Sequence, residues 1–375
     1  MRKILILTGR YLPGYKDGGP VRTIKNLSDS LGDEYDIRIL TNDRDHGDIN
    51  SYSDIIDDSW NKVGNAKVWY VKPKEFTFSL IKKLSLEADI IYCCGPYDIY
   101  AIKVMILKKI NVIKKTLVIA SMGSFSSGAL KLKNIKKSIF LNFFKILGLF
   151  NNVVWSVTSE VEENDLKCII GKKAKCIIAE DLLRNTLVKH NRVKKPNELY
   201  IIFLSRICEM KNLIGVIRIL NQISSFKIIF DIYGNVEDVT YWRKCKKELE
   251  KLPDNIIWKY CGKCDSKNVP ETFSKYDIFL FPTLGENFGH VIGEALLAGC
   301  IPIISDTTPW LELDQFKCGN VIELSRINNF VDKLKEYALM DNDEFCKYVD
   351  RAQKYVLEKN KKSIENTGYR RIFNL

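Results

Sequence analysis

Short apolar runs alternate along the chain with longer segments whose apolar residues recur at helical spacing. A strand buried in a parallel sheet reads as a continuous apolar run, and a helix must follow it to return the chain to the next strand. The alternation therefore predicts βαβ units and parallel sheets. The expected strands are residues 3–7, 36–41, 66–71, 89–94, 116–121, 153–158 and 175–179, followed by 199–205, 227–234, 256–262, 277–283 and 301–306.

The pattern stops at the polar stretch KHNRVKKPNE, residues 189–198, and then restarts. A chain of 375 residues is also too long for one ordinary core. We therefore expect two Rossmann-like doubly wound α/β domains, residues 1–188 and 199–357, joined by this linker and facing a central cleft. Residues 358–375 form a tail. The sequence allows this tail to pack back on the first domain, among other arrangements.

The stretch FPTLGENFGHVIGEALLAGCIPIISD places two carboxylates, Glu286 and Glu294, eight positions apart around a glycine-containing turn. The pattern predicts that Glu286 lies in a loop and that Glu294 lies inside a helix that begins near Phe288. Six residues of helix rise about 9 Å, whereas the two acids of a retaining glycosidase lie about 5 to 5.5 Å apart. We therefore expect the two acids to hold two ends of one elongated ligand.

The start of that helix lies between the two acids, and its backbone amides would attract an anion. A carboxylate, an anion-binding helix end and a second carboxylate together suit a nucleotide sugar. The competing interpretation is that Glu294 is solvated and that Glu286 only caps the loop. The amides expected at the helix start belong to Phe288, Gly289, His290 and Val291.

The composition narrows the class of protein further. Eleven cysteines, an odd number, make a poor disulfide framework and indicate a reducing, cytoplasmic location. The apolar run near the N-terminus is too short for a signal peptide. Cys261 and Cys264 form one CxxC without a second pair at zinc spacing, so we expect no metal.

The formal net charge of +12 comes from lysines scattered along the chain. No nucleic-acid-binding motif accompanies them, so we expect no nucleic acid as a partner. An anionic substrate, an anionic membrane surface and a merely lysine-rich composition all remain as explanations of the charge.

The stretch GENFGHVIGEAL resembles the E-x7-E signature of retaining sugar transferases with the GT-B fold, in particular glycosyltransferase family 4, or group 1. FLSRICEMKNL is similar to the segment of that family that binds the donor diphosphate, with Arg206 and Lys211 at the matching positions. YLPGYKDGGPVRTIKNLSDSL resembles its N-terminal glycine loop through Gly18 and Gly19. The resemblance spans nearly the whole chain.

Two further stretches, IYGNVED and KYCGKCDSKNV, resemble the strands that lead to the base pocket of the family, and the second contains Lys263. The chain departs from the family pattern in three places. Met122 stands where many relatives carry a polar residue, Ser205 replaces the glycine before the arginine, and Asn212 follows the lysine.

The resemblance implies a retaining glycosyltransferase that uses a UDP- or GDP-linked sugar as donor, with no separate cofactor and no metal. It implies that Glu286 holds the transferred sugar and Glu294 the ribose, while Arg206 and Lys211 neutralise the diphosphate. Cations at this place suit a leaving group that gains negative charge. Many relatives extend lipid-linked oligosaccharides of bacterial surface polysaccharides such as lipopolysaccharide or capsule, so a glycan or lipid-linked acceptor is expected.

Two other functions fit the same pattern. A nucleotide-sugar 2-epimerase can share the two-domain fold, because a fold does not fix a function. A nucleotide-binding protein or membrane scaffold without catalysis would also carry such a site.

The segment KLKNIKKSIFLNFFKILGLF, residues 131–150, places apolar residues at helical spacing beside several lysines. It is too polar for a spanning helix. It would suit either peripheral contact with an anionic membrane or packing on the N-terminal sheet. Its apolar residues are Leu132, Ile135, Ile139, Phe143, Leu147 and Phe150, and the lysines are Lys131, Lys133, Lys136 and Lys137, with Lys145 and Asn142 interrupting the apolar face.

Overall fold

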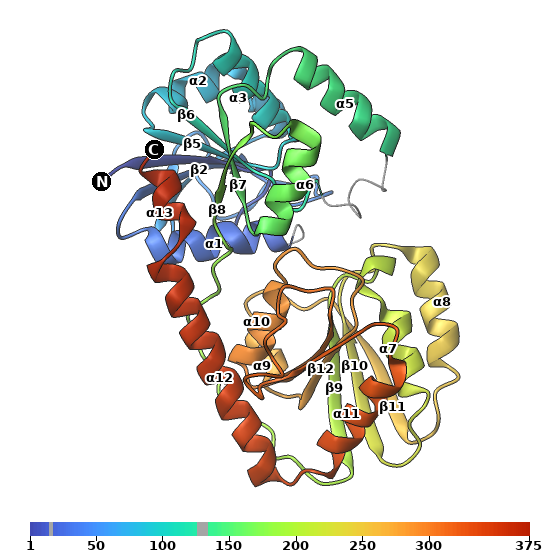
Figure 1. Ribbon diagram of the computed structural model, residues 1–375. Coiled ribbons are helices and arrows are strands. Elements are labelled where there is room, and N and C mark those ends of the chain that lie inside the picture. The colour runs from blue at the N-terminus through green and yellow to red at the C-terminus, as the bar shows by residue number, and fades with distance from the viewer. Residues whose placement is uncertain (15–17, 126–133) are drawn as a thin grey trace. The chain divides into compact units, whose positions relative to one another are not determined.

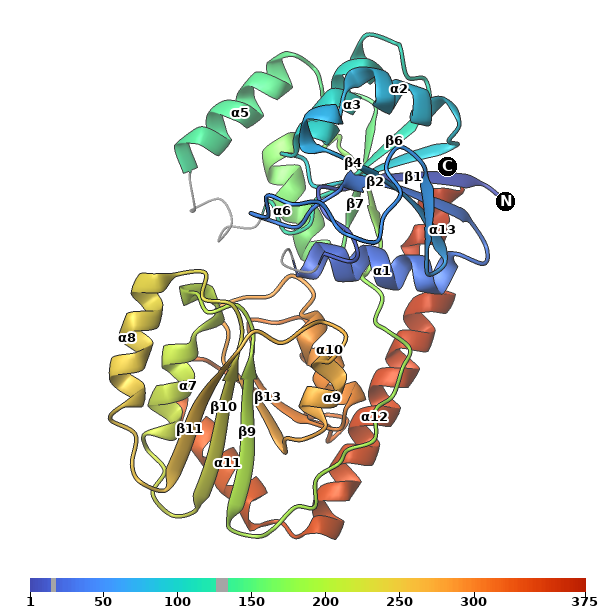
Figure 2. The same cartoon turned by 180° about the vertical axis from the view of Figure 1, so that it is seen from behind.

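The structure, a computed structural model, describes residues 1–14, 18–125 and 134–375 (Figures 1 and 2). The chain forms two α/β units, which confirms the expected doubly wound organisation. The N-terminal unit comprises Met1–Leu182 with Lys362–Leu375, and the C-terminal unit comprises Leu183–Lys361. The boundaries predicted from the sequence lie at residues 188 and 357, because polar composition marks where regular structure ends and not the unit on which a segment packs.

Within the described residues, the N-terminal unit contains an eight-stranded sheet in the order β3-β4-β2-β1-β5-β6-β7-β8. Its neighbouring strands are parallel except for β3 and β4. Side chains alternate between the two faces, so Leu5 and Leu7 enter one apolar layer while Ile4 and Ile6 enter the other. The strands are β1 (Lys3–Leu7), β2 (Asp36–Asn42), β3 (Trp60–Val63), β4 (Ala66–Val71), β5 (Ile90–Cys94), β6 (Thr116–Ala120), β7 (Val153–Val157) and β8 (Lys175–Ile178).

Helices cover both faces of this sheet (Figure 1). Apolar residues of α1 and α13 pack on one face, and those of α2, α3, α5 and α6 pack on the other. The helices are α1 (Gly19–Leu31), a 3-10 turn (Pro73–Glu75), α2 (Phe78–Leu86), α3 (Ile99–Lys109), α5 (Asn134–Ile146), α6 (Glu160–Ile170) and α13 (Gly368–Phe373).

The C-terminal unit, which is described throughout, contains a six-stranded parallel sheet in the order β11-β10-β9-β12-β13-β14. The chain builds outward from β9 in one direction and then outward from β12 in the other, so the order reverses between these two strands. The strands are β9 (Glu198–Leu204), β10 (Lys227–Tyr233), β11 (Ile256–Gly262), β12 (Ile278–Phe281), β13 (Ile301–Ser305) and β14 (Asn320–Ile322). The helices are a 3-10 turn (Glu209–Lys211), α7 (Leu213–Leu220), α8 (Val239–Leu249), α9 (Val269–Phe273), α10 (His290–Leu297), α11 (Ile327–Leu339) and α12 (Asn342–Glu365).

The last residues of the chain belong to the N-terminal unit. Tyr369, Ile372 and Phe373 of α13 are buried there, and the Phe373 ring lies 5.2 Å from the ring of Tyr35. Burial of three large apolar side chains holds this terminal helix in place.

The strand predictions agree with the structure apart from one or two residues at the strand ends, and two strands were missed. The first is β3, which pairs antiparallel with β4 through a two-residue turn at Gly64 and Asn65. The second is β14, which has only three residues. Neither strand has the continuous apolar run that marks a strand buried on both faces.

Helix α5 presents apolar side chains on two faces. Leu141 and Phe144 are buried in the unit, whereas Phe143 and Ile146 are exposed, as is Leu147 directly after the helix. Leu132 and the lysines at 131 and 133 lie outside the described residues, and the side chains of residues 134–139 are not described either. None of the helices in the described ranges is both long enough and apolar enough to span a membrane.

Candidate functional site

The loops that follow β9 and β12 are fastened to each other at the carboxyl edge of the C-terminal sheet. The carbonyl oxygen of Met210 accepts hydrogen bonds from the Thr283 hydroxyl at 3.0 Å and the Leu284 amide at 2.9 Å. The Asn212 side chain donates to the carbonyl oxygen of Pro282 at 2.7 Å. Because the strand order reverses between these two strands, this edge is where an open α/β sheet binds its ligand.

Lys211 and Glu286 form an ion pair at this edge. The Lys211 Nζ donates to Glu286 Oε1 at 2.6 Å, and the two side chains are 11% and 12% exposed. Asn212 takes the left-handed conformation, with φ of 54°, and its side chain caps α7 by accepting from the Gly215 amide at 3.1 Å. The cap fixes the backbone next to Lys211. Lys211 and Glu286, which were both predicted from the motifs, therefore lie in direct contact on a well-defined backbone.

Helix α10 begins two residues later than the start predicted near Phe288. Gly289 directly precedes the helix in the left-handed conformation, with φ of 77°, so the helix cannot extend back beyond His290. A Cβ atom on Gly289 would lie 3.0 Å from Ile292 Cδ1 and 3.3 Å from Trp310 Nε1. The Trp310 indole also donates to the carbonyl oxygen of Phe288 at 2.7 Å. Phe288 and Gly289 therefore form the entry to the helix and not its first turn.

The first residues of α10 are His290 and Val291, and both are buried. Glu294 lies one turn further along the same helix and is also buried. The amino-terminal end of a helix carries partial positive charge and favours an anion. Anion binding by this helix end stays a prediction.

Glu294 has a charged neighbour that the sequence analysis missed. Arg184 Nη2 lies 3.2 Å from Glu294 Oε1, and the Glu294 side chain is only 4% exposed. Arg184 stands 110 positions before Glu294 in a stretch without regular structure. No motif or period marks it, and the predicted boundary at residue 188 assigned it to the other domain.

Arg206 lies in a different environment from Lys211. Its guanidinium pairs with Glu237 at 2.6 Å, and the two side chains are 55% and 49% exposed. The loop that holds Glu237 approaches closely, because a Cβ atom on Gly234 would lie 1.7 Å from the carbonyl oxygen of Ser205. The structure thus brings Lys211 and Glu286 together and places Arg206 in a separate, solvated pair.

Lys263 follows directly after β11. Its Nζ lies 3.9 Å from an Asp265 carboxylate oxygen, and its side chain is about one third exposed. A role near a nucleotide base stays a prediction for this residue.

The predicted glycine pair belongs to the N-terminal unit. Gly18 has a φ of 63° and precedes α1, whereas Gly19 is the first residue of that helix. Among the described residues other than the chain neighbours, a Cβ atom on either glycine would meet no atom within 4 Å. Gly18 is therefore required by its backbone conformation, and the structure gives no steric reason for glycine at position 19.

Across residues 1–14, 18–125 and 134–375, no group of three or more His, Cys, Asp and Glu side chains could hold a metal ion. Cys264 of the CxxC instead contacts the Thr272 hydroxyl at 3.4 Å.

Comparison with known proteins adds a family match and several similar folds. The model of glycosyl transferases group 1 matches residues 186–355, which make up most of the C-terminal unit. An uncharacterized 41.2 kDa protein in the cps region of Klebsiella pneumoniae is 24% identical over 274 residues, covering 70% of this chain and 72% of that protein.

Two solved structures share the fold over nearly the whole chain. HepE from Anabaena in complex with UDP and glucose has a TM-score of 0.64 at 15% identity, covering 97% of this chain and 99% of its own. A mutant of TarM from S. aureus in complex with fondaparinux, alpha-GlcNAc-glycerol and UDP has a TM-score of 0.67 at 13% identity, covering all of both chains. The similar structures therefore show the GT-B fold over nearly the whole chain, and the family model of glycosyl transferases group 1 matches most of the C-terminal unit.

Proposed function

We propose that the protein is a retaining glycosyltransferase that moves a sugar from a nucleoside-diphosphate sugar to a glycan acceptor. The observation that carries this proposal is the Lys211–Glu286 pair at the carboxyl edge between β9 and β12. A cation for a phosphate and an acid for sugar hydroxyls stand side by side there, next to the loop that leads into α10. HepE and TarM were solved with UDP, which supports a nucleotide-sugar donor, either UDP- or GDP-linked.

The chemistry assigns each side chain a distinct part of the donor. Lys211 and the start of α10 would neutralise the diphosphate as its charge grows. Glu286 would accept hydrogen bonds from the transferred sugar, and Glu294 would accept them from the ribose. Arg206, which is exposed, would act from the rim of the site.

The remaining predicted contacts lie in other loops. Lys263 would approach the base, whereas diphosphate binding by the amides at Gly18 and Gly19, which belong to the N-terminal unit, stays a prediction from the sequence. These cations and amides provide a positive field without a metal ion.

Transfer with retention would proceed by attack on the front face of the anomeric carbon. The bond from that carbon to the diphosphate oxygen breaks, and the bond to the acceptor oxygen forms on the same face. The acceptor proton passes to the leaving phosphate, which gains the electron pair of the broken bond. The chain needs only to orient the donor and stabilise the leaving charge.

The acceptor that we propose is a lipid-linked oligosaccharide of a bacterial surface polysaccharide, extended at the cytoplasmic face of the membrane. The relative from a cps region agrees with this use. The exposed Phe143 and Ile146 of α5, with Leu147 directly after the helix, would provide peripheral contact with an anionic membrane.

A thermal-shift panel of nucleoside diphosphates and sugar nucleotides tests the donor site, because a ligand of the folded state raises the melting temperature. Sugar nucleotides that stabilise the protein are then incubated without an acceptor. A transferase leaves the sugar unchanged or hydrolyses it slowly, whereas conversion to the 2-epimer would identify an epimerase. Binding without turnover in any acceptor pool would contradict catalysis.

A further inference from the structure

A short strap, residues 183–188, is seated on helix α10. The buried Asn360 of α12 accepts a hydrogen bond from the Leu183 amide at 3.0 Å and donates one to the Leu183 carbonyl oxygen at 3.3 Å. The Leu183 side chain lies directly over Gly293, where a Cβ atom would lie 2.6 Å from Leu183 Cδ2. The strap reaches α10 at this point because position 293 has no side chain.

The other end of the strap is attached to the same helix. The Val188 amide donates to the carbonyl oxygen of Leu297 at 3.2 Å. The Gln353 side chain donates to the carbonyl oxygens of both Val188, at 2.9 Å, and Leu297, at 3.0 Å. The strap is therefore held at both of its ends against α10.

Arg184 lies beside the first of these anchors. Its Nη2 donates to Glu294 Oε1 at 3.2 Å and to the carbonyl oxygen of Ser266 at 3.4 Å. Glu294 directly follows Gly293, and Arg184 directly follows Leu183. The packing of Leu183 over Gly293 therefore places the Arg184 guanidinium opposite the Glu294 carboxylate. Ser266 belongs to the loop after β11, so one guanidinium links α10 to that loop.

We propose that Arg184 is a positioning residue that orients the Glu294 carboxylate for the ribose hydroxyls of the nucleotide, and so determines discrimination between ribose and 2′-deoxyribose. The inference rests on the proposed function. A planar guanidinium holds the carboxylate oxygen that it contacts in one direction, so its removal should let that oxygen turn away from the position seen with Arg184. Reading a hydroxyl group requires an acceptor in a fixed place, because a misplaced acceptor gains little from the hydroxyl.

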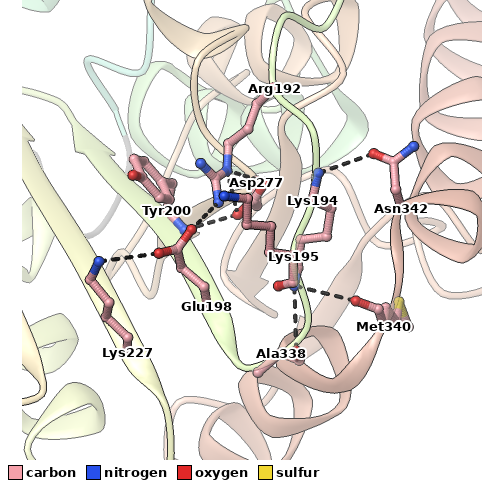
Figure 3. A network of polar contacts seen from close by, with 10 residues as sticks. All are labelled: Arg192, Lys194, Lys195, Glu198, Tyr200, Lys227, Asp277, Ala338, Met340 and Asn342. Carbon is pink, nitrogen blue, oxygen red and sulfur yellow. Dashed lines mark hydrogen bonds and ion pairs between the residues drawn. The ribbon is translucent and has the colours of Figure 1, made fainter.

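Arg192 offers a matched control in the same C-terminal unit (Figure 3). Its Nε donates to both carboxylate oxygens of Asp277, at 2.9 and 3.0 Å, and its Nη2 donates to Glu198 at 3.0 Å. Asp277 is fully buried and also accepts the Tyr200 amide at 2.9 Å. Arg192 thus pairs with a buried carboxylate as Arg184 does, but at the amino ends of β9 and β12, away from the Lys211–Glu286 pair.

The experiment measures the affinity ratio of UDP to 2′-deoxy-UDP by calorimetry, or of GDP to 2′-deoxy-GDP where the thermal-shift panel selects guanosine. The wild type should prefer the ribonucleotide by about tenfold or more, as expected for a charge-assisted hydrogen bond. Arg184→Gln should reduce the ratio to below about threefold, Arg184→Lys should restore part of it, and Arg192→Lys should leave it unchanged while lowering the melting temperature.

A double-mutant cycle separates positioning from general stability. In the Glu294→Gln background, Arg184→Gln should change the ratio no further. A wild-type ratio in folded Arg184→Gln and Arg184→Lys, or equal effects of Arg184→Gln with and without Glu294, would overturn the inference and leave the proposed function intact. Failure of the wild type to bind either nucleoside diphosphate would overturn both.

Discussion

The Lys211 ammonium lies 2.6 Å from the Glu286 carboxylate, and both side chains are almost entirely shielded from water. A diphosphate that binds Lys211 must therefore compete with a carboxylate that already neutralises it. The pair thus couples the acid assigned to the sugar with the cation assigned to the phosphate.

This coupling predicts that Glu286→Gln strengthens binding of a nucleoside diphosphate while it weakens catalysis. Removing the carboxylate charge leaves Lys211 available to the diphosphate, so UDP affinity should rise about three- to tenfold. Turnover should fall about 100-fold, because the sugar loses the acid that orients it. Calorimetry with UDP and kinetics with the sugar nucleotide measure the two effects. Weaker UDP binding, as expected for Glu294→Gln, would contradict the coupling.

The two predicted cations should differ in importance. Lys211→Ala should lower kcat/KM by about 100-fold, since a shielded cation acts strongly on a growing charge. Arg206→Ala should cost less than about tenfold, because Arg206 is 55% exposed and its charge is screened by water and salt. Because salt screens exposed charges more than shielded ones, the rate of Arg206→Ala should also depend less on salt than that of the wild type. Equal losses of kcat/KM in the two folded variants would contradict the expectation that the shielded cation contributes more to catalysis than the exposed one.

Most of the fold could be predicted because strands such as β9 and β12 are buried on both faces and therefore read as unbroken apolar runs. The edge strand β3 has mixed and partly exposed residues, so its sequence carries no such signal. Its only local sign is the two-residue Gly64–Asn65 turn, which is typical of a hairpin.

The candidate site was only partly predictable for a different reason. Glu286, Glu294 and Lys211 stand at fixed spacings within motifs, and each follows or lies within a regular element. The place of Arg184 depends on contacts between distant segments, namely Leu183 with Gly293 and Asn360. The spacing of residues along the sequence cannot indicate such contacts, because they arise only when the strap packs on the folded unit.

Membrane contact through α5 predicts that Phe143→Ser with Ile146→Ser weakens binding to vesicles containing anionic lipid. The two side chains are 56% and 84% exposed, and each would bury apolar surface in the lipid interface. Vesicle flotation should show a loss of at least about tenfold, with activity on a soluble acceptor unchanged. Val161→Ser on α6, which removes another exposed apolar side chain, serves as the control. Equal binding by the double variant and this control would exclude the exposed face of α5 as the contact.

We expect the buried His190 to make the folded protein less stable in mild acid. Its ring lies 5.7 Å from that of Phe345, and its Cβ atom packs close to Gly299. Burial lowers the pKa of His190 from 6.5 to about 4, and the charge of Arg192 acts in the same direction. Between about pH 6.5 and pH 4 the unfolded chain binds a proton at His190, whereas the folded state does not. The free energy of unfolding is therefore unaffected by His190 above about pH 6.5 and falls as the pH decreases toward 4.

The expected change is at most about 3 kcal/mol, since each pKa unit corresponds to about 1.4 kcal/mol. Denaturant unfolding of the wild type and of His190→Phe, measured between pH 7 and pH 4.5, tests it because Phe keeps a ring against Phe345 and cannot be protonated. The difference in unfolding free energy between the two proteins should shift in favour of the variant as the pH falls, while the titration of other groups cancels. Parallel pH profiles would show that His190 does not destabilise the folded state when the protein is acidified.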